Sequence, residues 1–228
     1  MPTSERVFDT RVRDFLATHR FKSYLDIGPG AGKYGKMIKE LMPEAKVFCI
    51  EAEDNYIKQF DLKSTYDVVH HSKVEAFFDD KPDFTIDVVI IGDCLEHLKK
   101  SDGLDLINYL VYRCRYILIV FPSKYVQYSI NGFSSEAHLS VWSKHDFANF
   151  NFKYIVKKRY IRGRFIRPLY MNLVIIRGYI GNPSAISDWI EPGIAKRIFQ
   201  SFIKKCEANP NLHWLQTLIQ SLRTKIPV

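Results

Sequence analysis

The segment LDIGPGAGKYG, residues 25–35, places four glycines within eight residues directly after a short apolar run. A glycine-rich turn of this kind brings the backbone close to a phosphate or a nucleoside, because glycine has no side chain and readily adopts left-handed backbone angles. Three classes of site begin with such a turn. They differ in the spacing of the glycines and in the charged residues around them.

The first class, the P-loop, does not fit. That motif places a glycine five residues before its Gly-Lys pair and a Ser or Thr directly after the pair. Here Ile27 stands five residues before Gly32, and Tyr34 occupies the Ser/Thr position. The second class, the dinucleotide fingerprint G-x-G-x-x-G, matches residues 30–35, and Glu51 follows at a suitable distance for a ribose.

The third class fits without adjustment, as Asp26-x-Gly28-x-Gly30-x-Gly32. An acid ends the strand, and the alternating glycines let the backbone turn beneath an amino acid and a ribose. The alternative is a glycine-rich turn that binds nothing, but such a turn rarely needs three alternating glycines and an acid. The sequence therefore predicts a nucleoside site at the end of the first strand.

Short apolar, β-branched runs alternate with helix-like stretches over the first 121 residues, which predicts a parallel sheet covered on both faces. The expected strands are 23–27, 46–51, 66–70, 86–91 and 115–121, and the expected helices are 5–19, 31–41, 53–60, 73–79 and 95–111. After Pro122 a polar loop leads to a short helix near 143–149 and to two β-like runs at 152–161 and 169–177.

These elements predict an α/β fold: a doubly wound, mostly parallel, seven-stranded Rossmann-like sheet that ends in an antiparallel hairpin. Residues 1–180 would form one domain that opens with an N-terminal helix at 1–20, and residues 181–228 a basic C-terminal helical extension. Apolar stripes at 192–206 and 211–222 must be buried. Three surfaces could bury these stripes: the chain's own sheet, a homodimer interface and a membrane surface.

The net charge of +8 is concentrated in the C-terminal third of the chain. Residues 151–228 carry 14 Lys or Arg and 3 Asp or Glu, which leaves 19 basic and 22 acidic residues for 1–150. The basic run 157–167 includes two aromatic residues. This composition suits an anionic partner, of which a nucleic acid is the less favoured kind. The alternative is a solvated face of the final hairpin.

The four cysteines lie far apart without a C-x-x-C pair, so neither a zinc clip nor a disulfide framework is expected. No apolar run approaches the ~20 residues of a membrane span, and the N-terminus has no apolar leader segment. We therefore expect a cytoplasmic protein without a transmembrane segment.

The sequence resembles the class I S-adenosylmethionine-dependent methyltransferases over roughly residues 20–180. The family's first motif is similar to the segment that holds Asp26, Gly28, Gly30 and Gly32, and Glu51 stands where the family's acid binds both ribose hydroxyls. Residues 91–98, IGDCLEHL, are similar to the family's D-x-x-E-H-L signature. The resemblance implies S-adenosylmethionine as cofactor and residues 1–180 as the methyltransferase domain.

One position departs from the family pattern. Many relatives have an acid after the third strand that accepts from the adenine amino group, whereas this chain reads His-His-Ser-Lys-Val at 70–74. Ser72 is expected to accept from that amino group and Val74 to pack on the ring, with Ser72 as a helix N-cap as the alternative. Asp93, after the fourth strand, is a further expected cofactor contact.

Asp93, Glu96 and His97 are expected at i, i+3 and i+4 on the first turn of the helix at 95–111, so that they share one face. Glu136 and His138 follow the fifth strand and should reach the same edge of the sheet. Ubiquinone-pathway O-methyltransferases and small-RNA 2′-O-methyltransferases resemble this arrangement.

Three interpretations of these side chains stay open. In the first, a divalent metal such as Mg²⁺ is held by Asp93, Glu96, His97 and His138, and it acidifies an acceptor hydroxyl. In the second, His97 or His138 is a metal-free general base beside Asp93. In the third, the cluster only supports loops under the active site.

The expected activity is methyl transfer from S-adenosylmethionine to a hydroxyl of a sugar, a glycan or another small molecule, including an anionic one. An RNA ribose 2′-hydroxyl is the second choice of acceptor. From other classes, a nicotinamide-dependent oxidoreductase and a catalytically silent scaffold remain. The oxidoreductase is disfavoured because no Tyr-x-x-x-Lys set lies between the fourth strand and the final hairpin.

Overall fold

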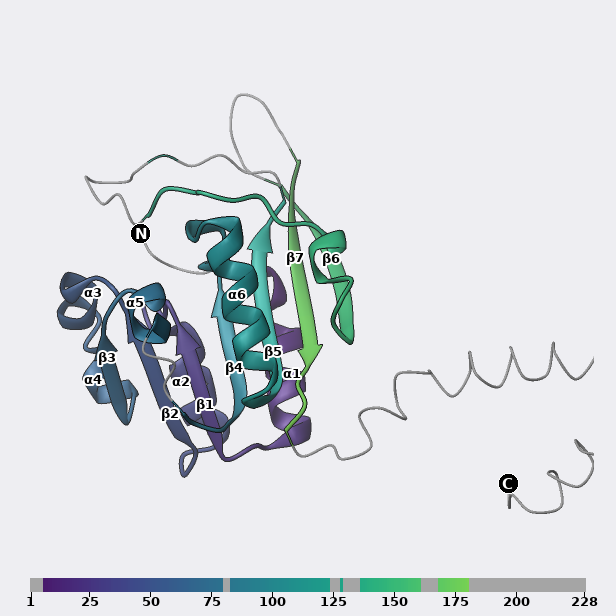
Figure 1. Ribbon diagram of the computed structural model, residues 1–228. Coiled ribbons are helices and arrows are strands. Elements are labelled where there is room, and N and C mark those ends of the chain that lie inside the picture. Colours follow the sequence, from purple (N-terminus) through teal and green to yellow (C-terminus); the bar gives the residue numbers. More distant parts are fainter. Residues whose placement is uncertain (1–5, 80–82, 124–127, 129–135, 161–167, 181–228) are drawn as a thin grey trace, which may run out of the picture. The chain divides into compact units, whose positions relative to one another are not determined.

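The computed structural model describes residues 6–79, 83–123, 128, 136–160 and 168–180. Seven strands of this part of the chain form one sheet in the order β3-β2-β1-β4-β5-β7-β6 (Figure 1). The strands are β1 (Ser23–Ile27), β2 (Lys46–Glu51), β3 (Val68–His71), β4 (Ile86–Gly92), β5 (Cys114–Pro122), β6 (Phe152–Tyr160) and β7 (Pro168–Arg177).

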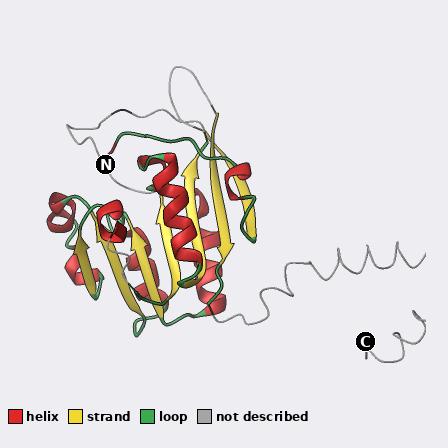
Figure 2. Cartoon of the chain, in the orientation of Figure 1, coloured by secondary structure: helices red, strands yellow, loops and turns green. Residues whose placement is uncertain are grey.

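Helices cover both faces of the sheet (Figure 2). Figure 1 shows α5 and α6 on one face and α1 and α2 on the other. The α-helices are α1 (Asp9–His19), α2 (Lys33–Leu41), α3 (Asp54–Gln59), α4 (Leu62–Thr65), α5 (Val74–Asp79) and α6 (Lys100–Val111). The short 3₁₀ helices are η1 (Arg6–Phe8), η2 (Leu95–His97) and η4 (Lys144–Phe147).

The first five strands pair in parallel, whereas β7 runs antiparallel to both β5 and β6. The predicted doubly wound sheet with a final antiparallel hairpin is therefore confirmed. The strand order reverses between β1 and β4, which lie side by side. In open α/β sheets, ligands bind beyond the carboxyl ends of the strands at such a reversal.

The core consists of two apolar layers, one on each face of the sheet. In β4, Val89 and Ile91 pack into the layer beneath α6, while Val88 and Ile90 pack into the layer beneath α1 and α2. All four are at most 1% exposed. A strand that is buried on both faces has a continuous apolar sequence. Burial of each such side chain stabilises the folded state by ~1.5–3 kcal/mol.

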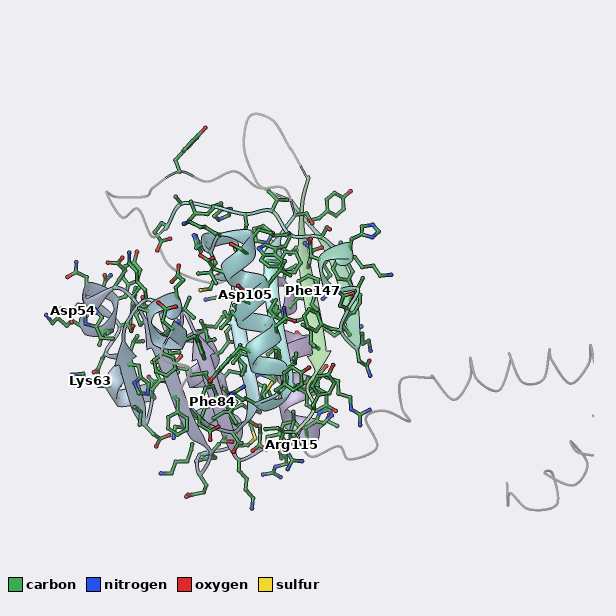
Figure 3. All side chains as sticks on the ribbon, in the orientation of Figure 1. Asp54, Lys63, Phe84, Asp105, Arg115 and Phe147 are labelled. Carbon is green, nitrogen blue, oxygen red and sulfur yellow. The ribbon has the colours of Figure 1, made fainter. Side chains whose placement is uncertain are left out.

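Trp142 and Phe147, in the described part of the segment after β5, pack into the apolar layer beneath α6. Phe147, labelled in Figure 3, is fully buried there, and its ring centroid lies 5.7 Å from that of Phe121 and 5.8 Å from that of Trp142. Trp142 in turn packs against Gly103 of α6 so closely that a Cβ at Gly103 would lie 2.6 Å from the indole. These contacts fix the segment that carries His138.

The helix expected at 53–60 is confirmed as α3, but the start of the third strand was wrong. A left-handed residue, Asp61 (φ 45°), and a second helix, α4, follow α3, so β3 begins two residues later than expected. The helix expected at 95–111 is interrupted: η2 ends at His97, Leu98 is extended (φ −88°, ψ 153°), and α6 begins at Lys100.

Several predictions fall outside the described residues: the C-terminal extension 181–228 with its helices and dimer interface, and the basic residues 161–167. None of the helices in the described part combines the length and the apolar character that a membrane span requires. Three cysteines lie in that part, Cys49, Cys94 and Cys114, and all are free thiols.

Candidate cofactor site and active site

The glycine loop after β1 is built on left-handed backbone. Gly28, Gly30 and Gly32 have φ angles of 65°, 52° and 74°, a region that costs an L-residue roughly 1–2 kcal/mol. A Cβ at Gly28 would also lie 2.5 Å from Sγ of Cys94, which follows β4. The loop therefore needs glycine for its conformation, and at Gly28 also for its contact with the neighbouring strand end.

Glu51, the last residue of β2, reaches this loop. Its side chain is 5% exposed, and its Oε2 accepts a hydrogen bond from the Gly30 N–H at 3.2 Å. Its Oε1 accepts one from the Glu53 N–H at 2.9 Å. Burial raises the pKa of the Glu51 carboxyl. The structure thus brings together the acid and the glycine loop that the sequence assigned to one site.

Asp26 is buried, with only 1% of its surface exposed. The Tyr66 hydroxyl donates to its Oδ2 at 2.6 Å, and the same hydroxyl accepts from the Gly35 N–H at 3.2 Å. Oδ1 of Asp26 has no hydrogen-bond partner in the described part of the chain. Burial raises the pKa of Asp26 to about 7. Tyr66 was not predicted, because only the folded chain places it near Asp26.

Ser72 and Val74 lie beside the end of β2. The Ser72 N–H donates to the Glu51 carbonyl at 3.0 Å, and its hydroxyl donates to the Lys73 carbonyl at 2.9 Å. Lys73, not Ser72, directly precedes α5, so Ser72 does not occupy the N-cap position. Val74 is the first residue of α5 and is buried. The two residues predicted for adenine thus adjoin the acid predicted for ribose.

Asp93 does not occupy a helical turn, contrary to the prediction. It has a left-handed backbone (φ 50°), and its N–H donates to the Val120 carbonyl at 2.8 Å. The i, i+3, i+4 argument therefore fails, because Asp93 precedes η2 with non-helical angles. Glu96 is 3% exposed, and its Oε2 has no hydrogen-bond partner in the described residues. Burial and then the charge of Asp93 raise the pKa of Glu96 well above its ordinary value.

His97 and His138 meet above Glu96. Their ring centroids are 4.9 Å apart at an interplanar angle of 81°. Nδ1 of His97 lies 3.1 Å from the Ala137 carbonyl oxygen, which only accepts, so Nδ1 carries the proton and Nε2 of the neutral ring has the lone pair. One potential ligand atom from each of Glu96, His97 and His138 lies within 4.8 Å of the others, and Asp93 is outside this group.

The segment around His138 is held on both sides. The Glu96 carbonyl accepts from the Leu139 N–H at 2.8 Å and from the Ser140 N–H at 3.1 Å. Further along, the Lys100 ammonium donates to the Val141 carbonyl at 2.6 Å. Lys100 also pairs with Asp146 at 2.8 Å and lies 4.1 Å from the centroid of Trp142. Lys100 was not predicted from the sequence.

Glu136 contacts α3. Its Oε1 accepts a hydrogen bond from the Tyr56 hydroxyl at 2.9 Å. Tyr56 belongs to α3, which follows Glu51. The contact joins the segment that carries His138 to the side of the site that carries Glu51.

The sequence matches no protein-family model, and it matches no curated protein. Solved structures do match. The N-terminal domain of EvdMO1, crystallised with S-adenosylhomocysteine and D-fucose, aligns with a TM-score of 0.55 at 12% identity, covering 78% of this chain and 85% of that one. Magnesium protoporphyrin IX methyltransferase from Synechocystis PCC 6803, with bound S-adenosylhomocysteine, aligns with a TM-score of 0.50 at 15% identity, covering 74% and 81%.

A third match is an S-adenosylmethionine-dependent methyltransferase from Archaeoglobus fulgidus, with a TM-score of 0.51 at 18% identity, covering 74% of this chain and 93% of that one. All three identities are low, so the likeness concerns the fold. The chain has the fold of S-adenosylmethionine-dependent methyltransferases.

Proposed function

We propose that this protein is an S-adenosylmethionine-dependent methyltransferase that methylates a hydroxyl group of a sugar, a glycan or another small molecule. The observation that carries the proposal is the contact between the Glu51 carboxylate and the glycine loop at the reversal point of a methyltransferase-like sheet. The occurrence of S-adenosylhomocysteine in two of the structures that this chain resembles supports the cofactor.

The residues at the site fit this cofactor chemically. The Glu51 carboxylate accepts from the Gly30 and Glu53 N–H groups on different oxygens and has lone-pair capacity left for a ribose hydroxyl. The unpartnered Oδ1 of Asp26 is a buried acceptor for the ammonium of the methionine part. Ser72 and Val74 would contact the adenine. The bound cofactor supplies an activated methyl group, so the protein's main task is to align the acceptor oxygen with it.

We further propose that Glu96, His97 and His138 hold a divalent cation such as Mg²⁺. Two imidazoles and one carboxylate form a ligand set that leaves positions open for other ligands. The buried Oε2 of Glu96 lacks a partner, and the Nδ1–H of His97 is held by a carbonyl so that Nε2 can act as ligand. Asp93 lies beside these ligands rather than among them. A cation there would lower the pKa of an acceptor hydroxyl.

The alternative mechanism uses no metal. With Nδ1–H of His97 bonded to the Ala137 carbonyl, Nε2 is available as a general base for the acceptor proton. The RNA ribose 2′-hydroxyl remains the second choice of acceptor, since at a 3′-terminal nucleotide the adjacent 3′-hydroxyl would also suit a metal. The small-molecule acceptor leads because EvdMO1, which this chain resembles in fold, was crystallised with a sugar.

Calorimetric titration of the full chain tests the proposal. S-adenosylhomocysteine is expected to bind with micromolar affinity, while NAD shows no heat of binding. A tritiated-methyl transfer assay with a panel of sugars, small phenols and RNA then identifies the acceptor. Binding of NAD without binding of S-adenosylhomocysteine would reject the proposal in favour of an oxidoreductase. Cofactor binding without methyl transfer to any acceptor class would favour a scaffold.

A further inference from the structure

A cavity of about 360 Å³ lies between the N-terminal part of α1, the first two turns of α2 and the glycine loop. Pro29 and Ala31 of that loop line one wall. The volume corresponds to roughly a dozen water molecules at ~30 Å³ each. It is therefore large enough for a phosphate or carboxylate group together with part of the molecule that carries it.

The cavity is lined mainly by charged side chains, and the positive ones are in excess. Four are basic and two are acidic: Arg6, Arg13, Lys33 and Lys36 against Asp9 and Glu40. The formal charge of the lining is +2. Residues 1–150 as a whole carry more acidic than basic side chains, so this positive charge is a local feature.

Each acid of the lining pairs with one of the cations. Glu40 accepts from both terminal nitrogens of Arg13, at 3.1 and 2.8 Å. Asp9 pairs with the Lys33 ammonium at 2.8 Å. These two ion pairs account for both negative charges. The excess positive charge therefore belongs to the remaining two cations.

Those two cations are Arg6 and Lys36. The Lys36 ammonium donates one hydrogen bond to the Ala31 carbonyl at 3.0 Å, a contact that leaves its charge unneutralised. Arg6 forms no ion pair and no hydrogen bond with the residues that the structure describes. A guanidinium offers five N–H donors in a planar fork that matches phosphate and carboxylate oxygens. An anion would satisfy these donors.

The cavity adjoins the edge of the sheet where methyl transfer is proposed. The Lys33 ammonium lies 4.3 Å from the centroid of the Tyr34 ring. The same ring packs on the last residue of β4, since a Cβ at Gly92 would lie 2.2 Å from Cε2 of Tyr34. Tyr34 thus contacts both Lys33, which lines the cavity, and Gly92, which precedes Asp93. Burial, and after it the charges of Asp93, Asp9 and Asp26, raises the pKa of the Tyr34 hydroxyl.

We propose that this cavity binds an anionic group of the methyl acceptor, a phosphate or a carboxylate, through Arg6, Lys33 and Lys36. The assignment to the acceptor rests on the proposed methyltransferase function, whereas anion binding itself does not. The Lys33–Asp9 pair sets the strength of the site, because Asp9 competes with the ligand for Lys33. The acceptor would then be an acidic hydroxyl compound, such as a phosphorylated or carboxylated sugar.

The test uses inorganic phosphate and malonate as probes, titrated into the full chain by calorimetry at about 20 mM ionic strength, where screening is weak. We expect Arg6→Gln and Lys36→Gln each to weaken binding of at least one probe by roughly fivefold or more, since each removes a charge-assisted hydrogen bond. Asp9→Asn should strengthen binding, because it frees Lys33. The matched control is Arg11→Gln, an exposed cation of α1 that does not line the cavity.

Unchanged affinity in Arg6→Gln and Lys36→Gln, or an equal loss in Arg11→Gln, would overturn the proposed site in favour of non-specific charge attraction. A preference for phosphate over malonate, or the reverse, identifies which anion the acceptor carries. S-adenosylhomocysteine is titrated into the same variants. The affinity for S-adenosylhomocysteine should not change. If it falls in parallel with the affinity for the probes, the cavity binds the cofactor's own carboxylate, and the assignment of the cavity to the acceptor is overturned. If S-adenosylhomocysteine does not bind even the wild type, the methyltransferase proposal fails while the probe titrations still decide anion binding.

Discussion

The Glu51 carboxylate accepts a hydrogen bond from the backbone N–H of Gly30 at 3.2 Å, although 20 residues and a complete helix separate them in the chain. The contact joins the ends of β1 and β2, which are neighbours in the sheet. It holds the loop in position and leaves the carboxylate at the surface of the proposed nucleoside site. Two predictions depend on it.

Glu51→Gln should weaken S-adenosylhomocysteine binding by roughly tenfold or more, because the amide nitrogen cannot accept from a ribose hydroxyl. The measurement is a calorimetric titration, with circular dichroism to show that the variant is folded. Glu44→Gln, at an exposed position, is the matched control. Equal affinities of Glu51→Gln and wild type would remove Glu51 from the cofactor site.

Gly30→Val should abolish detectable S-adenosylhomocysteine binding. A β-branched residue at φ 52° is strained by roughly 1–2 kcal/mol, and its methyl groups would fill space that the backbone leaves for the ligand. Gly30→Ala carries the same backbone strain with less bulk, so its loss should be smaller. If both variants bind as the wild type does, the glycine loop does not face the cofactor.

Asp26 should make stability depend on pH. Burial raises its pKa to about 7, from 3.8 for an ordinary aspartate. Between those values the folded state keeps the proton and the unfolded chain loses it, so the free energy of unfolding falls as pH rises from about 4 to 7. A pKa shift of this size changes the free energy of unfolding by on the order of 4 kcal/mol.

Denaturant unfolding of wild type and Asp26→Asn at pH 4.5, 6 and 7.5 measures this dependence. Asn keeps an oxygen that accepts from the Tyr66 hydroxyl, and it does not titrate. Burial also raises the pKa values of Glu51 and Glu96, so the difference between the two proteins isolates Asp26. Parallel pH profiles would show that Asp26 is ionised in the folded state across this range.

The sheet could be predicted from the sequence because each central strand is a continuous apolar run, as in Val88–Ile91. Contacts such as that of Tyr66 with Asp26 or of Lys100 with Trp142 could not, since they join residues about 40 positions apart that share no local pattern. The helical spacing expected for Asp93, Glu96 and His97 failed for a related reason. Apolar periodicity from Leu95 onward does not reveal a left-handed residue at Asp93 or an extended one at Leu98.

That correction changes the expected metal ligands. The described structure places Glu96, His97 and His138 within ligand distance of one another and leaves Asp93 outside. The sequence named all four residues, because in the expected helix Asp93 would have shared a face with Glu96 and His97. Glu96→Ala and His138→Ala are therefore expected to remove metal binding, whereas Asp93→Asn should retain it.

The final prediction separates the metal mechanism from the general-base mechanism. If a divalent cation acts at this cluster, a chelator should stop methyl transfer, and Mg²⁺ or Mn²⁺ should restore it. Glu96→Ala and His138→Ala should each lower the rate by more than roughly tenfold. Affinity for S-adenosylhomocysteine should hardly change in these variants, because in this mechanism the cluster would contact the acceptor rather than the cofactor.

If His97 is instead a metal-free base, the chelator has no effect, and the rate falls as pH drops through the pKa of the imidazole. His97→Ala would then be the damaging change, whereas Glu96→Gln, which fills the same buried space, would be nearly neutral. Should His97→Ala and the chelator both leave the rate unchanged, the cluster serves only to hold the segment that carries His138 against η2. Alignment of the acceptor with the methyl group would then account for catalysis.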